Sequence, residues 1–143
     1  MKELHTEVEI AAPAEKVWQI LTDFAKYPQW NPFITEISGE PKNGARLEVH
    51  INAPNDKERV YKPIVENVEK NRELRWLGKA FAGMFSGEHS FSIEPINEKH
   101  VRFNQDEKFS GLLTAFMGKR VDTKIRQGFE QMNIALKTRA ERT

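Results

Sequence analysis

Apolar and polar residues alternate at the start of the chain. Over residues 4–10, the apolar side chains and Thr6 fall on one parity, and His5 and two glutamates fall on the other. A period of two predicts a strand with one buried face. Pro13 then predicts the start of a helix, because a proline there sacrifices no hydrogen bond in the first turn. The predicted helix presents one apolar stripe, made of Val17, Trp18, Leu21 and Phe24.

The middle of the chain consists of short strand-like runs separated by residues that favour turns. Pro28 and Pro32 first limit the segment after the helix to a short helical turn. From residue 34 onward, turn residues such as Asn43-Gly44 and Asn97-Glu98 separate the apolar runs, which predicts an antiparallel meander. We predict its strands at 34–40, 46–52, 58–69, 72–79, 84–95 and 100–109, seven with the first.

The last part of the chain has helical periodicity. After Gly111 the apolar side chains recur on one stripe, which comprises Leu113, Met117, Val121, Ile125, Phe129, Met132 and Leu136. We predict one long C-terminal helix that crosses the whole sheet. Gly128 lies on this stripe, where glycine costs about 1 kcal/mol relative to alanine. Either the absent side chain leaves room for a ligand, or it allows close packing of the helix on the sheet.

Three parts of the sequence carry a family resemblance. They are AAPAEKVWQILTDFAKYPQWNPFI at 11–34, GEHSFSIEPI at 87–96, and FSGLLTAFMGKRV with GFEQMNIALKTRAE near the end. They resemble the START-like (SRPBCC) superfamily, and within it the polyketide cyclase/dehydrase and lipid-transport branch. The resemblance covers nearly the whole chain and implies a single domain, residues 1–143.

This resemblance implies an α+β helix-grip fold. A seven-stranded curved antiparallel sheet would surround the long C-terminal helix, and two short helices would follow the first strand. The family fold also implies an internal cavity between sheet and helix that takes an apolar or amphipathic small molecule.

Two adjacent predicted strands place polar residues among inward-facing apolar ones. His89 shares its parity with neighbouring phenylalanines, and Gln105 and Glu107 share the apolar parity of the next strand. A turn at 97–99 pairs His89 with Glu107, whereas a register shifted by one residue would mismatch the two inward sets. We hypothesise that the two side chains are neighbours in the cavity, where they orient a ligand or act as acid and base. The alternative is that these polar groups satisfy each other or reach solvent.

Further candidate ligand-binding residues come from the proline-bracketed segment, the aromatic residues and the helix. Aromatic walls with polar tips suit an amphipathic ligand, although plain core packing is the alternative for the tryptophans. The stretch AFAGMFSG at 80–87 is either a mobile apolar lid or an ordinary strand connection. The full candidate set is Trp30, Asn31, Tyr61, Trp76, Phe85, Gly87, His89, Phe91, Gln105, Glu107, Val121, Ile125 and Gly128.

Composition excludes several kinds of chemistry. The 143 residues include no cysteine, and 22 Lys and Arg against 21 Asp and Glu leave a formal net charge of +1. Disulfides and thiolate chemistry are therefore excluded, and a nearly neutral chain does not favour a nucleic-acid partner. The four histidines have no metal-ligand spacing and no nucleotide-binding motif occurs, so we expect no metal and no cofactor. The N-terminus resembles neither a signal peptide nor a membrane span, so we expect a cytoplasmic location.

The sequence favours a binding module for a hydrophobic or amphipathic small molecule of lipid, polyketide or isoprenoid type. Two alternatives stay open: a cofactor-independent cyclase or dehydratase that uses His89 and Glu107, and a protein-interaction adaptor. Residues 112–143 carry seven Lys and Arg against three acids, which indicates a solvated helix face or transient docking to an anionic membrane. We expect no stable membrane insertion, and a monomer or weak dimer.

Overall fold

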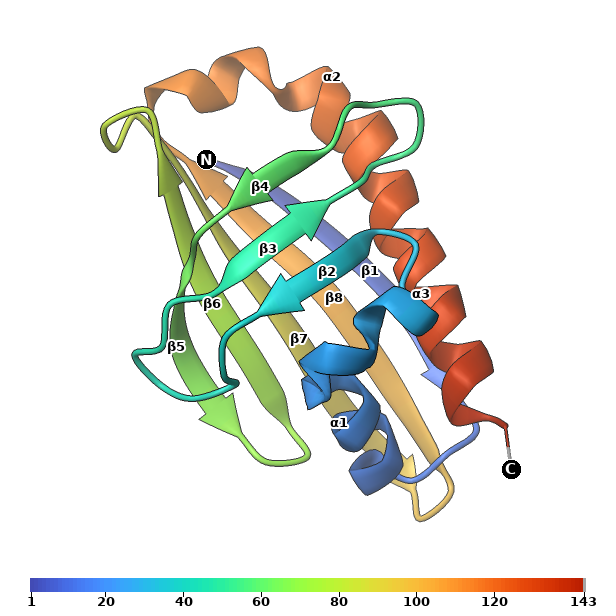
Figure 1. Cartoon of the computed structure of the whole chain (residues 1–143). Coiled ribbons are helices and arrows are strands. Elements are labelled where there is room, and N and C mark those ends of the chain that lie inside the picture. Colours follow the sequence, from blue (N-terminus) through green and yellow to red (C-terminus); the bar gives the residue numbers. More distant parts are fainter. Residues whose placement is uncertain (143) are drawn as a thin grey trace.

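Two antiparallel sheets carry most of the fold. The computed structural model describes residues 1–142. In this part of the chain, the larger sheet has the strand order β1 (Lys2–Ile10), β8 (His100–Ser110), β7 (Phe85–Asn97), β6 (Glu73–Ala80) and β5 (Ile64–Glu69). The smaller sheet contains β2 (Ile34–Ser38), β3 (Glu48–Ile51) and β4 (Arg59–Tyr61). Figure 1 shows the smaller sheet crossing in front of the larger one, with the C-terminal helix along one side.

The helices lie after the first strand and at the end of the chain. Helix α1 (Ala14–Thr22) begins directly after Pro13, as predicted, and a 3₁₀ turn at Phe24–Gln29 follows it. A second 3₁₀ turn, at Leu112–Phe116, follows β8. One continuous helix then comprises α2 (Gly118–Arg120), a π-helical turn (Val121–Ile125) and α3 (Arg126–Ala140). The predicted α+β helix-grip arrangement of antiparallel sheets and a long C-terminal helix is confirmed, but that helix begins at Gly118 rather than directly after Gly111.

The prediction of a single seven-stranded sheet was wrong in one respect. The run predicted at 58–69 forms two strands, β4 and β5, which belong to different sheets and are separated at Lys62-Pro63. Proline has no N–H to donate to a strand ladder, so the pairing on β4 ends before it. The Pro63 carbonyl still accepts the N–H of Leu47 at 2.9 Å, and Val65 donates to the Ala45 carbonyl at 2.8 Å. These bonds connect the two sheets at one edge.

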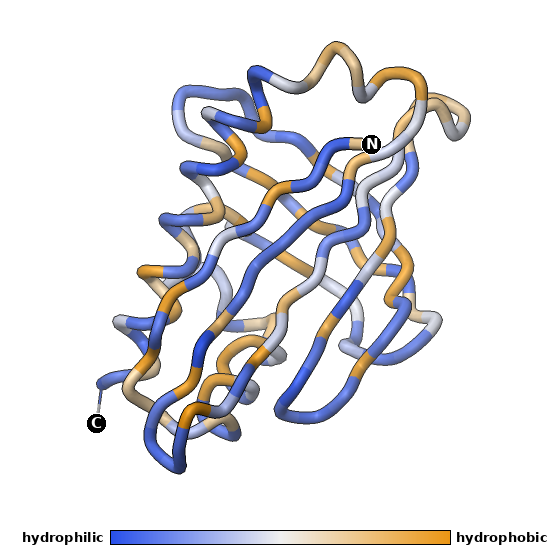
Figure 2. The backbone as a smooth tube through the Cα atoms, turned by 180° about the vertical axis from the view of Figure 1, so that it is seen from behind, coloured by the Kyte–Doolittle hydropathy of each residue, from blue (hydrophilic) through white to orange (hydrophobic). Residues whose placement is uncertain are grey.

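Alternation along the long strands separates the two faces of the larger sheet. In Figure 2, which views the molecule from behind, hydrophobic and hydrophilic positions succeed each other along the strands. The inward positions of β7 are buried from Phe85 to Ile93, and the residues between them are partly exposed. Because strand side chains alternate between faces, one face of the larger sheet forms the core with the smaller sheet and the helices.

Gly128 allows the C-terminal helix to approach the segment before β2 closely. A Cβ atom placed on Gly128 would overlap the aromatic ring of Phe33. Phe33 is buried and packs edge-on against Phe129, with ring centres 5.5 Å apart. The structure therefore matches the close-packing interpretation of Gly128, with Phe33 in the space that the glycine leaves.

Replacing Gly128 with alanine is expected to lower the free energy of unfolding by about 1–3 kcal/mol, because the Phe33 ring has to move out of a packed position. Gly118→Ala is the matched control, since a Cβ there meets no atom within 4 Å. This control is expected to be as stable as the wild type or up to about 1 kcal/mol more stable, because alanine favours the helix. Urea unfolding of the three proteins measures both effects, and equal stability of Gly128→Ala and wild type would contradict the packing role.

Candidate functional site

A cavity lies between the two sheets and the C-terminal helix. Its volume, counted as the space open to the centre of a water-sized molecule, is about 70 Å³. Seven of the candidate ligand-binding residues line it, namely Tyr61, Trp76, Phe85, Gly87, His89, Glu107 and Ile125. The walls that sequence reasoning missed come from Phe33, Val49, Ile51, Pro63, Gly78, Lys79, Ala80, Phe109, Met117 and Arg120. Most of these residues are apolar, so the cavity favours an apolar guest.

One end of the cavity continues into a broad hollow on the surface. The two spaces share Tyr61, Phe85, Met117 and Arg120 in their walls. The hollow lies where the β6–β7 turn meets the 3₁₀ turn at Leu112–Phe116 and the start of the C-terminal helix (Figure 1). The cavity is therefore continuous with the surface at this end.

The stretch read as a lid forms the turn between β6 and β7. Phe81 and Ala82 have positive φ angles of 55°, which L-residues rarely adopt. The Phe81 side chain is 70% exposed and lines the surface hollow beside the mouth. Phe85 is buried and belongs to the cavity wall. The structure thus shows an apolar turn beside the mouth, and its movement as a lid stays a prediction.

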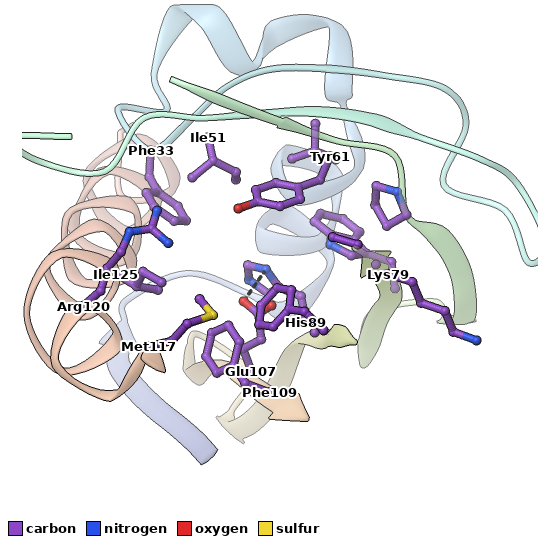
Figure 3. A pocket seen from close by; sticks show the side chains of 17 residues that line it. Phe33, Ile51, Tyr61, Lys79, His89, Glu107, Phe109, Met117, Arg120 and Ile125 are labelled. Atoms are coloured by element: carbon purple, nitrogen blue, oxygen red, sulfur yellow. Dashed lines mark ion pairs between the residues drawn. The ribbon is translucent and has the colours of Figure 1, made fainter. Parts of the chain in front are cut away.

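His89 and Glu107 lie side by side at the inner wall of the cavity. They are paired residues of β7 and β8, so the predicted register is confirmed. His89 Nδ1 lies 3.5 Å from Glu107 Oε1, as the dashed line in Figure 3 marks. A Cβ on Gly87 would overlap the Glu107 carboxyl, so this glycine makes room for the acid rather than for a ligand.

Burial keeps both members of this pair uncharged at neutral pH. Desolvation lowers the pKa of His89 to about 4, against a smaller opposing effect of its hydrogen bond to Gln105. Desolvation also raises the pKa of Glu107 to about 8. Both shifts follow from the cost of placing a charge where water is excluded. The cavity therefore offers an uncharged carboxyl group beside an uncharged imidazole.

A chain of buried polar side chains supports His89 from behind. His89 Nε2 lies 2.9 Å from Gln105 Oε1, and Gln105 Nε2 donates to Asn133 Oδ1 at 2.7 Å. Asn133 Nδ2 donates to the Thr6 hydroxyl at 2.9 Å, which in turn donates to the backbone carbonyl of Gln105 at 2.8 Å. The chain joins β7, β8, α3 and β1, and all four residues are buried.

A charged pair stands at the opposite side of the cavity. Arg120 Nη2 donates to Asp56 Oδ2 at 2.8 Å, and Arg120 Nε donates to the same oxygen at 3.1 Å. The hydrogen bonds from Arg120 are the main cause that lowers the pKa of Asp56 to about 2. This pair ties the loop between β3 and β4 to the helix beside the mouth. In Figure 3 the Tyr61 hydroxyl points into the space between this side and the His89–Glu107 pair.

Six candidate residues do not line the cavity. Phe91 and Gln105 lie behind His89, Val121 is buried in the core, and Gly128 faces Phe33. The other two belong to the segment after α1. Trp30 packs edge-on against Tyr27 beside a separate hollow, and Asn31 Oδ1 accepts the N–H groups of residues 33 and 34 at 3.0 and 2.9 Å. Neither residue belongs to the walls of this cavity, and Asn31 instead caps the start of β2.

The arrangement matches known proteins at the levels of family and fold. The family described as Polyketide cyclase / dehydrase and lipid transport matches residues 1–141. No curated protein gives a significant sequence match. A START superfamily protein from Mycobacterium smegmatis has 25% sequence identity and a TM-score of 0.77, with 97% of each chain covered.

Two solved enzymes share the fold at lower identity. The Zhui aromatase/cyclase from Streptomyces sp. R1128 has a TM-score of 0.80 at 14% identity, over 99% of this chain and 94% of that one. Norcoclaurine synthase from Thalictrum flavum, solved with dopamine and hydroxybenzaldehyde, has a TM-score of 0.74 at 15% identity, over 99% and 88% of the two chains. Within residues 1–142, no helix is both long and apolar enough to cross a membrane.

Replacing Glu107 with glutamine is expected to stabilise the protein at neutral pH. The folded pKa of about 8 exceeds the ordinary value of 4.5, so the unfolded chain loses its proton first as the pH rises between these values. Wild-type stability therefore falls across this window and is unaffected by Glu107 below it. Glutamine removes the ionisation and still offers an N–H to His89. We expect a gain on the order of 2 kcal/mol at pH 7, reduced for the partial exposure of the side chain.

Chemical unfolding of wild type and Glu107→Gln at pH 4 and at pH 7–8 measures this effect. Glu130→Gln is the control, because Glu130 lies on the exposed face of α3. A stability difference between wild type and Glu107→Gln that does not grow with pH would show that the carboxyl is already ionised in the folded protein.

Proposed function

Because the chain belongs to the polyketide cyclase/dehydrase and lipid transport family, we propose that it binds a hydrophobic or amphipathic small molecule in the cavity between its sheets and its C-terminal helix. The family includes ligand-binding and cyclase members. A lipid-, polyketide- or isoprenoid-like molecule suits the proposal. We place the protein in the cytoplasm, as a monomer or weak dimer.

The observation that carries this proposal is the apolar cavity with a polar pair on one wall. Residues such as Ile51, Trp76 and Phe109 supply apolar surface that a ligand would cover. Burying apolar surface contributes roughly 25 cal/mol per Å², which provides affinity without a specific contact. His89 and Glu107 offer the hydrogen bonds that fix which end of the ligand enters first.

A catalytic function is the second candidate, and the same pair favours it. An uncharged carboxyl beside an uncharged imidazole can donate and accept a proton within one enclosed site. A cyclisation or dehydration needs such proton transfers and no cofactor. Conversion of a bound ligand by the wild type, lost in both His89→Ala and Glu107→Ala, would support catalysis. Retention of the unchanged molecule would support binding alone.

An adaptor function concerns the rim of the cavity. Phe81, Leu112 and Phe116 are 70%, 78% and 84% exposed on the turns beside the mouth. Exposed apolar groups of this kind suit contact with a partner protein or a membrane. Contact with a partner protein and contact with a membrane would both use the surface around the mouth, so either is compatible with ligand entry at this end.

Native mass spectrometry of protein purified from its own host tests whether a small molecule is retained. A fluorescent apolar probe, N-phenyl-1-naphthylamine, tests the cavity directly. Gly78 lines the cavity, and a Cβ there meets only the Cβ of Pro63, at 3.8 Å. Gly78→Leu therefore adds a side chain at a wall where a Cβ has room, and it is expected to occupy cavity space and weaken probe binding by about tenfold or more.

Gly118→Leu provides the matched control, because Gly118 lies in open space outside the cavity lining. It should bind the probe as the wild type does, and thermal unfolding confirms that both variants are folded. Equal affinity of wild type and Gly78→Leu would refute binding in this cavity, as would an equal loss in the two variants.

A further inference from the structure

The polar chain behind His89 has a defined direction, because it starts from an atom that can only accept. The backbone carbonyl of Gln105 has no hydrogen, so the Thr6 hydroxyl has to donate to it. The hydroxyl has one proton, and the Asn133 side chain therefore has to turn its NH₂ group toward Thr6. This leaves Asn133 Oδ1 to accept from Gln105.

The orientation of the Gln105 amide follows from two acceptors. Its NH₂ group faces Asn133 Oδ1 at 2.7 Å and the backbone carbonyl of Phe129 at 3.4 Å. Gln105 Oε1 is therefore the atom that faces His89, and it accepts the hydrogen of His89 Nε2 at 2.9 Å. A neutral imidazole carries one hydrogen, so its other nitrogen, Nδ1, presents a lone pair.

This lone pair meets Glu107 on the cavity side of the ring. Nδ1 and Glu107 Oε1 lie 3.5 Å apart, and two lone pairs facing each other would repel. A hydrogen on the Glu107 carboxyl removes the repulsion and makes Glu107 the donor. The burial that raises the pKa of Glu107 supports the same assignment.

We propose that Thr6, Asn133 and Gln105 are positioning residues that fix His89 as the Nε2–H tautomer, so that His89 Nδ1 and the Glu107 carboxyl together hold a hydroxyl group of the ligand. The ligand part of this inference rests on the proposed function. A hydroxyl group donates one hydrogen and accepts another, so it is able to bridge the Glu107 donor and the Nδ1 acceptor.

A carboxylate does not suit this position. It only accepts, so it leaves Nδ1 without a donor, and it places a charge where burial already disfavours the charge of Glu107. The guanidinium of Arg120 is engaged by Asp56 on the other side of the cavity. The site therefore selects an apolar molecule with a neutral hydroxyl, such as a phenol or alcohol, over a fatty-acid-like molecule.

The tautomer is measured on the ligand-free protein by ¹⁵N NMR of the histidine rings at neutral pH. We expect Nε2 of His89 to show the shift of a protonated nitrogen and Nδ1 the shift of an unprotonated one. The three other histidines, which are more exposed, serve as internal references. A protonated Nδ1 in the wild type would overturn the proposal without any variant.

Gln105→Met removes the acceptor of the Nε2 hydrogen at similar side-chain length. The ¹⁵N shifts of His89 are expected to move toward those of the Nδ1–H tautomer. Gln105 and Glu107 are the polar partners of the His89 ring in the described residues, and this substitution leaves only Glu107. Gln127→Met, on an exposed position of the same helix as Asn133, should leave the pattern unchanged. A Gln105→Met protein that keeps the wild-type pattern would show that the relay does not set the tautomer.

Three probes of one shape test the ligand part by isothermal titration: 2-naphthol, naphthalene and 2-naphthoate. The wild type is expected to bind 2-naphthol about tenfold more tightly than naphthalene, and 2-naphthoate most weakly. Glu107→Met should abolish the preference for naphthol over naphthalene. If the wild type binds none of the probes, the proposed function fails, whereas equal binding of naphthol and naphthalene contradicts this inference alone.

Discussion

Buried polar groups need hydrogen-bond partners, and this requirement connects the larger sheet to the C-terminal helix. Thr6 of β1, Gln105 of β8 and Asn133 of α3 are buried, so the polar side chain of each depends on the others for hydrogen bonds. Their bonds fix the distance between helix and sheet on one side of His89. The cavity lies on its other side, between the sheets and the start of the helix, where Met117 and Ile125 form the wall. His89 thus lies between the hydrogen-bonded side chains on one side and the apolar cavity on the other.

The exclusion of water that makes these hydrogen bonds necessary also disfavours charged side chains. His89 and Glu107 both have pKa values displaced toward their uncharged forms, and desolvation is the main cause for each. Aromatic rings deepen this effect, since the His89 ring stacks on Phe91 and Phe129 with centres 4.5 and 4.8 Å apart. The cavity wall at His89 and Glu107 therefore offers hydrogen-bond donors and acceptors but no charged group. Recognition in such a site depends on the direction of each donor and acceptor.

Local patterns predicted most strands and the order of the elements, and the family resemblance added the helix-grip fold. The register of His89 with Glu107 was predicted because period-two alternation and a short turn leave one pairing that matches the buried faces. They did not predict that the chain leaves one sheet for another at Pro63. They also missed Phe33 and Arg120, since neither strand parity nor helical spacing reveals which distant segments meet at a cavity. Trp30 was a candidate because an aromatic side chain suits an amphipathic ligand, yet it packs against Tyr27 beside a different hollow.

The π-helical turn at Val121–Ile125 has a consequence for how this chain tolerates insertions and deletions. A π turn accommodates one more residue than an α turn, so it represents an extra residue held inside a continuous helix. In a regular α-helix one extra residue would rotate the part before it by about 100°, and the π turn absorbs this change locally. Deletion of one residue in this turn would therefore restore regular winding, while Met117, Arg120 and α3 kept their present orientations. Relatives of this protein that differ by one residue here would share both its scaffold and its cavity mouth.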